Sequence, residues 1–133
     1  MQAVFDENSP IYLQIMDLIK QRICASLWNL GDRLPSVREM AIELRVNPNT
    51  VQRAYQELER EGMVFTQRGM GTFVTEDQAK VETVRNELAS RLVRQFVDGM
   101  ARLGFEREQI RVKLDMYLEN RPMEQQGDDE ERG

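Results

Sequence analysis

Residues 34–74 constrain the fold of this chain most strongly, because two helix starts fall close together there. Ser36 and Glu39 have the spacing of a capping box, in which the hydroxyl and the carboxylate each bond an unsatisfied backbone amide at a helix start. Asn47 followed by Pro48 marks a second helix start a few residues later, because Asn suits the N-cap and Pro suits the first helical position. The pattern predicts two short helices joined by a tight turn.

Apolar residues follow each helix start at three- and four-residue steps, which gives each helix one buried face. These residues are Val37, Met40, Ala41 and Leu44, then Val51, Ala54, Tyr55 and Leu58. After a helix-ending Gly62, the segments Met63–Thr66 and Thr72–Val74 are typical of two strands, with Gly69 and Gly71 between them where positive φ is needed. The order of elements predicts a mostly α fold with a small β-hairpin, an N-terminal winged helix-turn-helix.

A further helix is predicted ahead of this motif. Ser9 is expected to be its N-cap, Pro10 its first residue, and Trp28 to lie near its end. Its apolar face comprises Ile11, Ile15, Leu18, Ile19, Ile23 and Leu27. We expect Trp28 to fill the core beneath the helix rather than to bind a partner.

Two more helices are predicted beyond Thr75, at Gln78–Arg102 and Glu106–Asn120. Their apolar positions include Leu88, Leu92, Phe96, Met100, Leu103, Ile110, Leu114 and Tyr117. Two such helices cannot bury their faces unaided, so they either fold back on the first domain or pair with a second copy. The apolar stripe favours a dimerisation segment. The expected domains are residues 1–75, the helical module 76–121 and a disordered acidic tail 122–133.

Composition narrows the class of protein. The chain has 133 residues, no His and one cysteine, Cys24, so no zinc site of neighbouring Cys and His is available and no internal disulfide can form. No apolar run approaches membrane-spanning length, and we expect a cytoplasmic protein with no membrane association. The net charge of −5 is concentrated in residues 76–133, whereas residues 1–75 contain eight Lys/Arg and nine Asp/Glu. A basic face on the first domain is therefore compatible with an acidic chain.

Several of these motifs, in this order, resemble the DNA-binding domain of GntR-type bacterial transcription regulators. The resemblance rests on Gly31–Ala41, Val46–Glu59, Glu61-Gly62 and Arg68–Val74, and covers about residues 9–75. Two C-terminal helices are too short for the large effector domains of most such regulators. They resemble the YtrA-type branch, in which such helices form a dimerisation module.

The resemblance implies which residues contact DNA. They are Arg33, Ser36, Arg38, Asn47, Asn49, Thr50, Gln52, Arg53, Arg68 and Gly69. Arg38 resembles an arginine that reaches a base edge or a phosphate in the major groove; the alternative is a surface ion pair with Glu39 or Glu43. Asn47 caps its helix, contacts DNA, or does both.

The hairpin tip and two departures from the family complete this set. Arg68 and Gly69 resemble a wing tip that enters the minor groove, and the alternative is an ordinary solvated turn. Many relatives carry arginine where this chain has Pro48 and Gln52. Gln52 suits adenine rather than guanine, so the operator sequence cannot be transferred from those relatives.

These features favour a transcriptional regulator, a repressor by resemblance, that binds double-stranded operator DNA with inverted-repeat symmetry as a homodimer. The alternative is a winged-helix module that binds proteins and not DNA. An enzyme is disfavoured, because the chain has no His, no glycine-rich phosphate loop and no paired nucleophile and base. No cofactor is expected. An unidentified small-molecule effector is left open, and it would have to lie between protomers around Phe96, Met100 or Tyr117, residues that otherwise form plain dimer core.

Overall fold

The computed structural model describes residues 5–120, which comprise five helices and a two-stranded sheet. The helices are α1 (Ile11–Cys24), α2 (Val37–Leu44), α3 (Pro48–Arg60), α4 (Gln78–Arg102) and α5 (Arg107–Asn120), and the strands are β1 (Val64–Gln67) and β2 (Gly71–Val74). The mostly α fold with a small hairpin is the predicted winged helix-turn-helix. The tail predicted at 122–133 and the first four residues of the chain lie outside the described residues.

The start of α2 follows the predicted capping box. The Ser36 hydroxyl accepts a hydrogen bond from the Glu39 amide at 3.0 Å, and the Glu39 carboxylate accepts one from the Ser36 amide at 2.8 Å. The start of α3 is also as predicted, since the Asn47 side chain accepts from the Asn49 amide at 2.7 Å and Pro48 is the first helical residue. These local signals therefore set the start of both helices of the motif.

The predicted bounds of α1 are wrong at both ends. Pro10, not Ser9, is the N-cap residue, and it supplies no side-chain cap. The helix ends at Cys24, because Ser26 adopts a left-handed conformation with φ 63° and turns the chain. Leu27, which was expected on the apolar face, is 57% exposed as a result.

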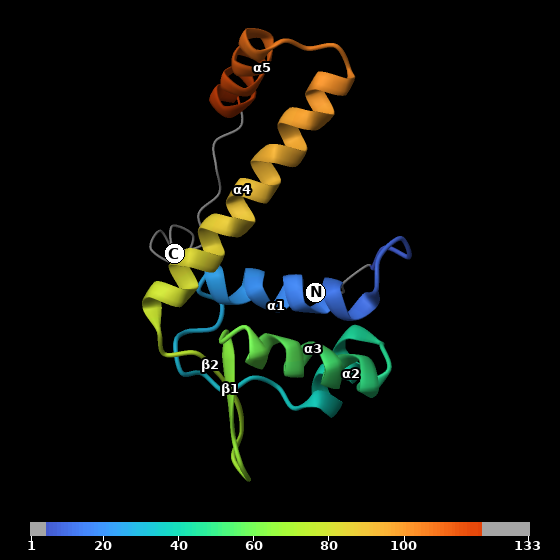
Figure 1. Cartoon of the computed structure of the whole chain (residues 1–133), viewed down its shortest axis with the longest axis vertical. Helices are drawn as coiled ribbons and strands as arrows, with labels where there is room; N and C mark the ends of the chain where they lie inside the picture. Colours follow the sequence, from blue (N-terminus) through green and yellow to red (C-terminus); the bar gives the residue numbers. More distant parts are fainter. Residues whose placement is uncertain (1–4, 121–133) are drawn as a thin grey trace. The chain divides into compact units, whose positions relative to one another are not determined.

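The core of the first unit lies between α1, α2 and α3 (Figure 1). Helix α3 packs against both α1 and α2. Ile15, Ile19 and Leu58 are fully buried there, and Ala54, also fully buried, lets helices approach closely. Trp28 is half-buried against this core, with the Arg22 guanidinium 5.3 Å from its ring centre. Trp28 thus packs against the core as expected.

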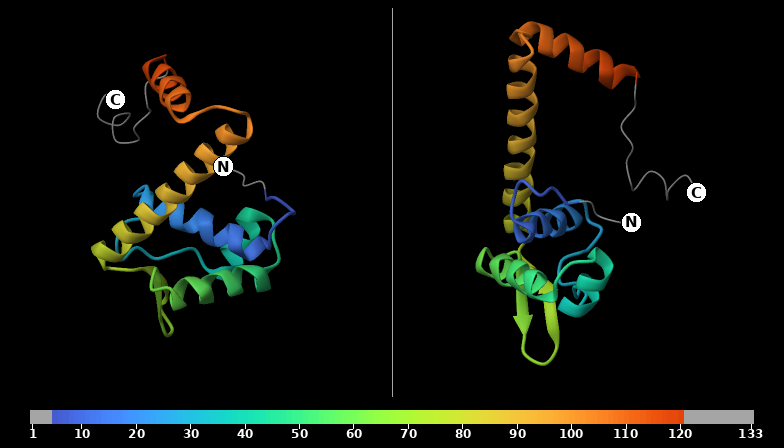
Figure 2. Two further views of the ribbon diagram at one scale, coloured as in Figure 1. Left: turned by 45° about the horizontal axis from the view of Figure 1, so that its top comes forward. Right: turned by 90° about the vertical axis from the view of Figure 1, so that its right-hand side faces the viewer.

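The hairpin, or wing, projects beyond α2 and α3 in both views of Figure 2. The strands are antiparallel, with Val64 opposite Val74 and Gln67 opposite Gly71. The backbone before α2 pairs with the other edge of β2, since the Leu34 amide donates to Thr72 at 2.7 Å and the Val74 amide donates to Asp32 at 2.7 Å. This third segment was not predicted from the sequence.

The chain divides into two compact units, residues 1–89 and 90–133, at a point within α4. In the first unit the initial turns of α4 pack on the core, where Val81 and Val84 are buried. In the second unit Ile110 is 9% exposed. The observed α4 has the predicted bounds, and α5 begins one residue later than predicted. The predicted domain boundary after residue 75 stays a prediction.

Candidate nucleic-acid interface

The basic residues of the winged helix differ in whether an acidic side chain pairs with them. Lys20 pairs with Glu61 at 2.8 Å, Arg22 with Glu43 at 2.7 Å and Arg60 with Glu57 at 3.3 Å. Within residues 5–75 the remaining arginines have no carboxylate within ion-pair distance; they are Arg33, Arg38, Arg45, Arg53 and Arg68. These five therefore keep their positive charge uncompensated by a contacting acid.

Arg38 is the second residue of α2 and is exposed. The alternative of a surface ion pair is wrong for this structure, because both candidate acids are engaged elsewhere. Glu39 bonds Ser36 in the capping box, and Glu43 holds Arg22. The Arg38 guanidinium is thus left with its donors available to an external acceptor.

The N-terminus of α3 presents the predicted polar residues to solvent. Asn47, Asn49 and Gln52 are exposed, and Thr50 is half-buried. Asn47 uses its side-chain oxygen as the cap, which leaves its NH2 group as a donor. The dipole of a helix start favours a negatively charged phosphate at this point.

Helices α2 and α3 are fixed relative to each other by Tyr55. Its hydroxyl donates to the Pro35 carbonyl at 2.7 Å, immediately before the N-cap of α2. Burial raises the pKa of the Tyr55 hydroxyl above its ordinary value, so the group stays a protonated donor. The hydrogen bond therefore sets where the α2 N-terminus, and with it Arg38, lies relative to α3.

Ser36 is the N-cap of α2 and stabilises the start of that helix. Its hydroxyl oxygen accepts from Glu39, so the side chain is engaged in the cap, although its O–H can still donate. The hydrogen bond that the Ser36 backbone amide donates to Glu39 lowers the pKa of the Glu39 carboxyl, because this hydrogen bond favours the ionised form. Its predicted role as a DNA contact remains a prediction.

The wing tip carries Arg68 and Gly69 in an exposed turn. Gly69 has φ 78°, and the Met70 amide closes the turn by donating to Gln67 at 2.8 Å. Arg68 makes no side-chain hydrogen bond or ion pair to residues 5–120. The tip thus presents one free guanidinium beside a residue with no side chain.

Two arginines, Arg33 and Arg45, have structural features that were not predicted from the sequence. Arg33 donates its Nε–H to the Met70 carbonyl at 3.1 Å, so it braces the wing. Arg45, the C-cap of α2, is exposed with φ 59° in the turn between α2 and α3. Arg45 was not among the predicted contacts; its position one residue after α2 and two before Asn47 is the signal that could have drawn attention to it.

The predicted dimerisation residues divide by exposure. Leu92 is 64% exposed, Leu103 74% and Tyr117 52%, and these three are joined by Phe96 and Leu114 among the exposed large apolar residues. Met100 is half-buried. Leu88 instead packs against the core of the first unit, and Ile110 is buried. The exposed members are the ones available to a second copy.

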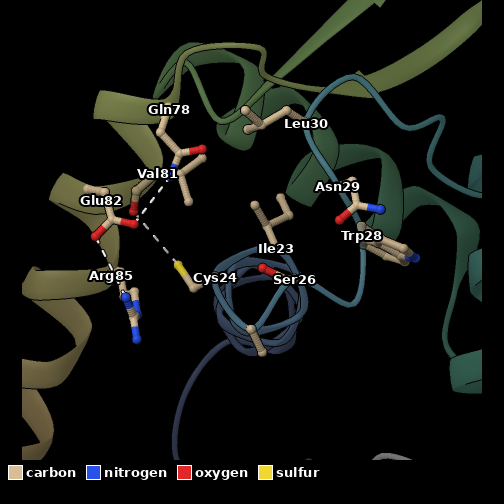
Figure 3. Close-up of a pocket in the computed structure, with 11 residues that line it drawn as sticks. Ile23, Cys24, Ser26, Trp28, Asn29, Leu30, Gln78, Val81, Glu82 and Arg85 are labelled. Atoms are coloured by element: carbon tan, nitrogen blue, oxygen red, sulfur yellow. Dashed lines mark hydrogen bonds and ion pairs between the residues drawn. The ribbon is translucent and has the colours of Figure 1, made fainter. Parts of the chain in front are cut away.

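A pocket of about 570 Å³ lies between the end of α1 and the first turns of α4 (Figure 3). Cys24 points toward α4 there, with its Sγ 4.0 Å from the Val81 carbonyl, and burial raises the pKa of its thiol. Glu82 and Arg85 form an ion pair of 3.7 Å at the edge of the pocket. Phe96, Met100 and Tyr117, around which an effector site was predicted, do not line this pocket.

Two other kinds of site are not seen among residues 5–120. No group of three or more Cys, Asp or Glu side chains there is arranged to hold a metal ion. None of the described helices combines the length and apolar character needed to cross a bilayer.

A family model described as bacterial regulatory proteins, gntR family, matches residues 11–74. The helix-turn-helix transcriptional regulator YhcF of Bacillus subtilis is 43% identical over 119 residues, 90% of this chain and 98% of YhcF. The repressor YtrA of the same organism is 46% identical over 81 residues, 61% of this chain and 62% of YtrA.

Among solved structures, a GntR family transcriptional regulator from Listeria monocytogenes superimposes with a TM-score of 0.78 at 41% sequence identity. The match covers 84% of this chain and 98% of the Listeria protein, so it extends beyond the winged helix into the C-terminal helices. The family match covers the segment that carries the free arginines, and the YhcF match spans nearly the whole of both chains. The chain therefore belongs to the GntR family of bacterial helix-turn-helix transcriptional regulators.

Proposed function

We propose that this regulator binds double-stranded DNA as a homodimer and represses transcription by occupying an inverted-repeat operator. The N-terminus of α3 would enter the major groove, and the wing would enter the adjacent minor groove. The observation that carries the proposal is the set of arginines without acidic partners, Arg38, Arg45 and Arg68, around an α3 start that favours phosphate.

Charge placement separates this proposal from a protein-docking function. Three cations of the winged helix are paired with acids, among them Lys20 with Glu61 and Arg22 with Glu43, whereas Arg38, Arg45 and Arg68 have no such partner among the described residues. A guanidinium offers a planar fork that matches guanine O6 and N7 together, or two phosphate oxygens. An unpaired guanidinium can gain phosphate or base partners on a nucleic acid. Against a neutral protein partner the same group would lose its hydration without gaining a partner.

Homodimerisation is supported by the C-terminal helices. On α4, Leu92 and Val93 are adjacent and Phe96 follows one helical turn after Leu92. These three side chains are 64%, 60% and 39% exposed. Exposed apolar patches of this kind mark interaction sites. A two-fold partner would place two α3 helices in major grooves about one helical turn apart, which matches an inverted repeat. The repressor role is supported by the name of the relative YtrA.

The test is selection of bound sequences from random duplex DNA by the purified full chain. The expected result is one enriched motif with two-fold symmetry and half-sites about 10 base pairs apart or a multiple of that spacing. A direct repeat or a lone half-site would contradict the symmetric dimer. Recovery of no motif, together with elution from heparin at low salt, would favour the protein-docking module. Repression itself is tested by a reporter gene with the enriched motif over its promoter.

A further inference from the structure

Of the five arginines within residues 5–75 that lack an acidic partner, Arg53 is the one that an aromatic ring holds in place. Its guanidinium carbon lies 3.9 Å from the centre of the Tyr12 ring. Tyr12 is the second residue of α1 and is half-buried against the core, whereas Arg53 lies on the second turn of α3 and is exposed. A side chain at the start of one helix therefore fixes the direction of a side chain on another.

The ring holds this arginine without consuming its charge. Arg22 provides the comparison, because it lies over Trp28 at 5.3 Å but also pairs with the Glu43 carboxylate at 2.7 Å. Arg53 makes no ion pair with any acid within residues 5–120. A ring contacts the flat face of a guanidinium, and the N–H donors at the edge stay available to an outside acceptor. Arg53 is thus oriented and still fully cationic.

Orientation before binding matters for a long side chain. A free arginine loses much rotamer freedom when it docks on DNA, and a side chain that is already held loses less. We propose that Tyr12 is a positioning residue for DNA recognition, whose ring holds the Arg53 guanidinium ready to contact a phosphate or a base edge. This inference rests on the proposed DNA-binding function, and nothing in it requires Tyr12 itself to contact DNA.

The experiment is a double-mutant cycle on the motif selected from random DNA, with affinity measured by fluorescence anisotropy of a labelled duplex. The variants are Tyr12→Leu, Tyr12→Phe, Arg53→Ala and the double variant Tyr12→Leu/Arg53→Ala. Tyr12→Leu should weaken binding about two- to fivefold for each protomer, the size of an exposed cation–π contact. Tyr12→Phe keeps the ring and should bind within about twofold of the wild type.

The decisive comparison is made in the Arg53→Ala background. If Tyr12 acts through Arg53, Tyr12→Leu should cause no further loss there, since the group that it positions is already absent. Equal loss in both backgrounds would overturn the inference, and would assign Tyr12 a direct or purely structural role. A loss in Tyr12→Phe as large as that in Tyr12→Leu would also overturn it, because the hydroxyl and not the ring would then matter. No effect of Tyr12→Leu on affinity in the wild-type background would overturn it too.

Two controls separate stability and the proposed function from this result. Trp28→Leu removes the ring from the neutralised Arg22 pair; it should lower the melting temperature but leave operator affinity within about twofold. Every affinity is measured at a temperature at which circular dichroism shows the variant to be folded. Failure of the wild-type chain to bind any selected duplex would contradict DNA binding as such. A wild type that binds, with a flat cycle, would contradict only the positioning role of Tyr12.

Discussion

Arg33 donates its Nε–H to the backbone carbonyl of Met70 at 3.1 Å, across 37 residues of chain, and so ties the segment before α2 to the tip of the wing. The wing is held from the α3 side as well, since the Thr66 hydroxyl and amide both bond the Glu59 carboxylate, at 3.1 and 3.3 Å. A residue predicted only as a DNA contact therefore also positions the wing. Its remaining N–H groups are still available for the proposed contact.

The first prediction concerns Gly71, which lies under the Arg33 side chain. Its φ is 125°, and a Cβ at this position would lie 2.6 Å from the Arg33 Nε. Gly71→Ala should displace Arg33 from the Met70 carbonyl and lower the free energy of unfolding by about 1–3 kcal/mol, measured by urea denaturation. Gly69→Ala is the control: its φ is 78° and no atom lies within 4 Å of the new Cβ, so only the backbone cost of about 1 kcal/mol is expected. Equal losses would argue against the clash.

The second prediction is a pH dependence at the start of α2. The hydrogen bonds from Ser36 lower the pKa of Glu39 in the folded protein, so its ionised form stabilises the fold above the pKa of the unfolded chain. That contribution is lost as the pH falls through the lower, folded pKa. Denaturation of wild type and Glu39→Gln should therefore show the wild type more stable at pH 7, with the difference shrinking toward zero at low pH. A difference that stays constant with pH would contradict the role of the charge.

The starts of α2 and α3 could be predicted from the sequence because the signals that fix them are local. Ser36 bonds a residue three positions away and Asn47 one two positions away, so the whole interaction lies within a few letters. The buried faces of both helices follow from apolar residues spaced three and four positions apart in the sequence. The same holds for α4, whose bounds match the prediction.

The features that the sequence did not predict depend on contacts between distant residues or on unusual backbone conformations. The Arg33–Met70 hydrogen bond and the Arg53–Tyr12 contact each join residues far apart in the chain, and neither leaves a periodic pattern. The early end of α1 depends on Ser26 in a left-handed conformation, which is uncommon for a residue other than glycine. The sequence could therefore name candidate arginines, but not which of them brace the wing or stack on a ring.

The third prediction concerns Arg38, the arginine at the start of α2. Because both neighbouring acids are engaged elsewhere, Arg38→Ala should remove only an outside contact and leave the fold intact. Operator affinity should fall by about 1–3 kcal/mol, measured by fluorescence anisotropy. If Arg38 reads a base, preference at one base pair should relax; if it contacts a phosphate, the slope of log affinity against log salt should fall by about 1.

Arg60→Ala is the matched control for this charge change. Arg60 lies at the end of α3 and pairs with Glu57, so its removal changes the net charge equally but takes away no free guanidinium. Its affinity for the operator should stay within about twofold of the wild type. Equal losses for the two variants would mean that only overall charge matters, and would argue against a specific contact from Arg38.

The fourth prediction tests the exposed stripe of α4 with two leucines one helical turn apart. Leu88 packs against the core of the first unit, whereas Leu92 is 64% exposed. Leu88→Glu should therefore destabilise the winged helix and lower its melting temperature. Leu92→Glu should leave the melting of the winged helix nearly unchanged, because Leu92 is largely exposed and belongs to the second unit, but it should place a charge in the interface with a second copy.

Sedimentation equilibrium and operator binding give the readouts for Leu92→Glu. The wild type should sediment as a dimer and the variant as a monomer. A monomer engages one half-site at a time, so it loses the effective concentration that a linked second site provides, and its affinity for the full operator should fall by about 10²- to 10⁴-fold. Its affinity for an isolated half-site should match the wild type, because Arg38, Arg53 and Arg68 are untouched. A Leu92→Glu variant that remains dimeric would place the interface elsewhere, and α5, whose Tyr117 is 52% exposed, would be the next surface to test.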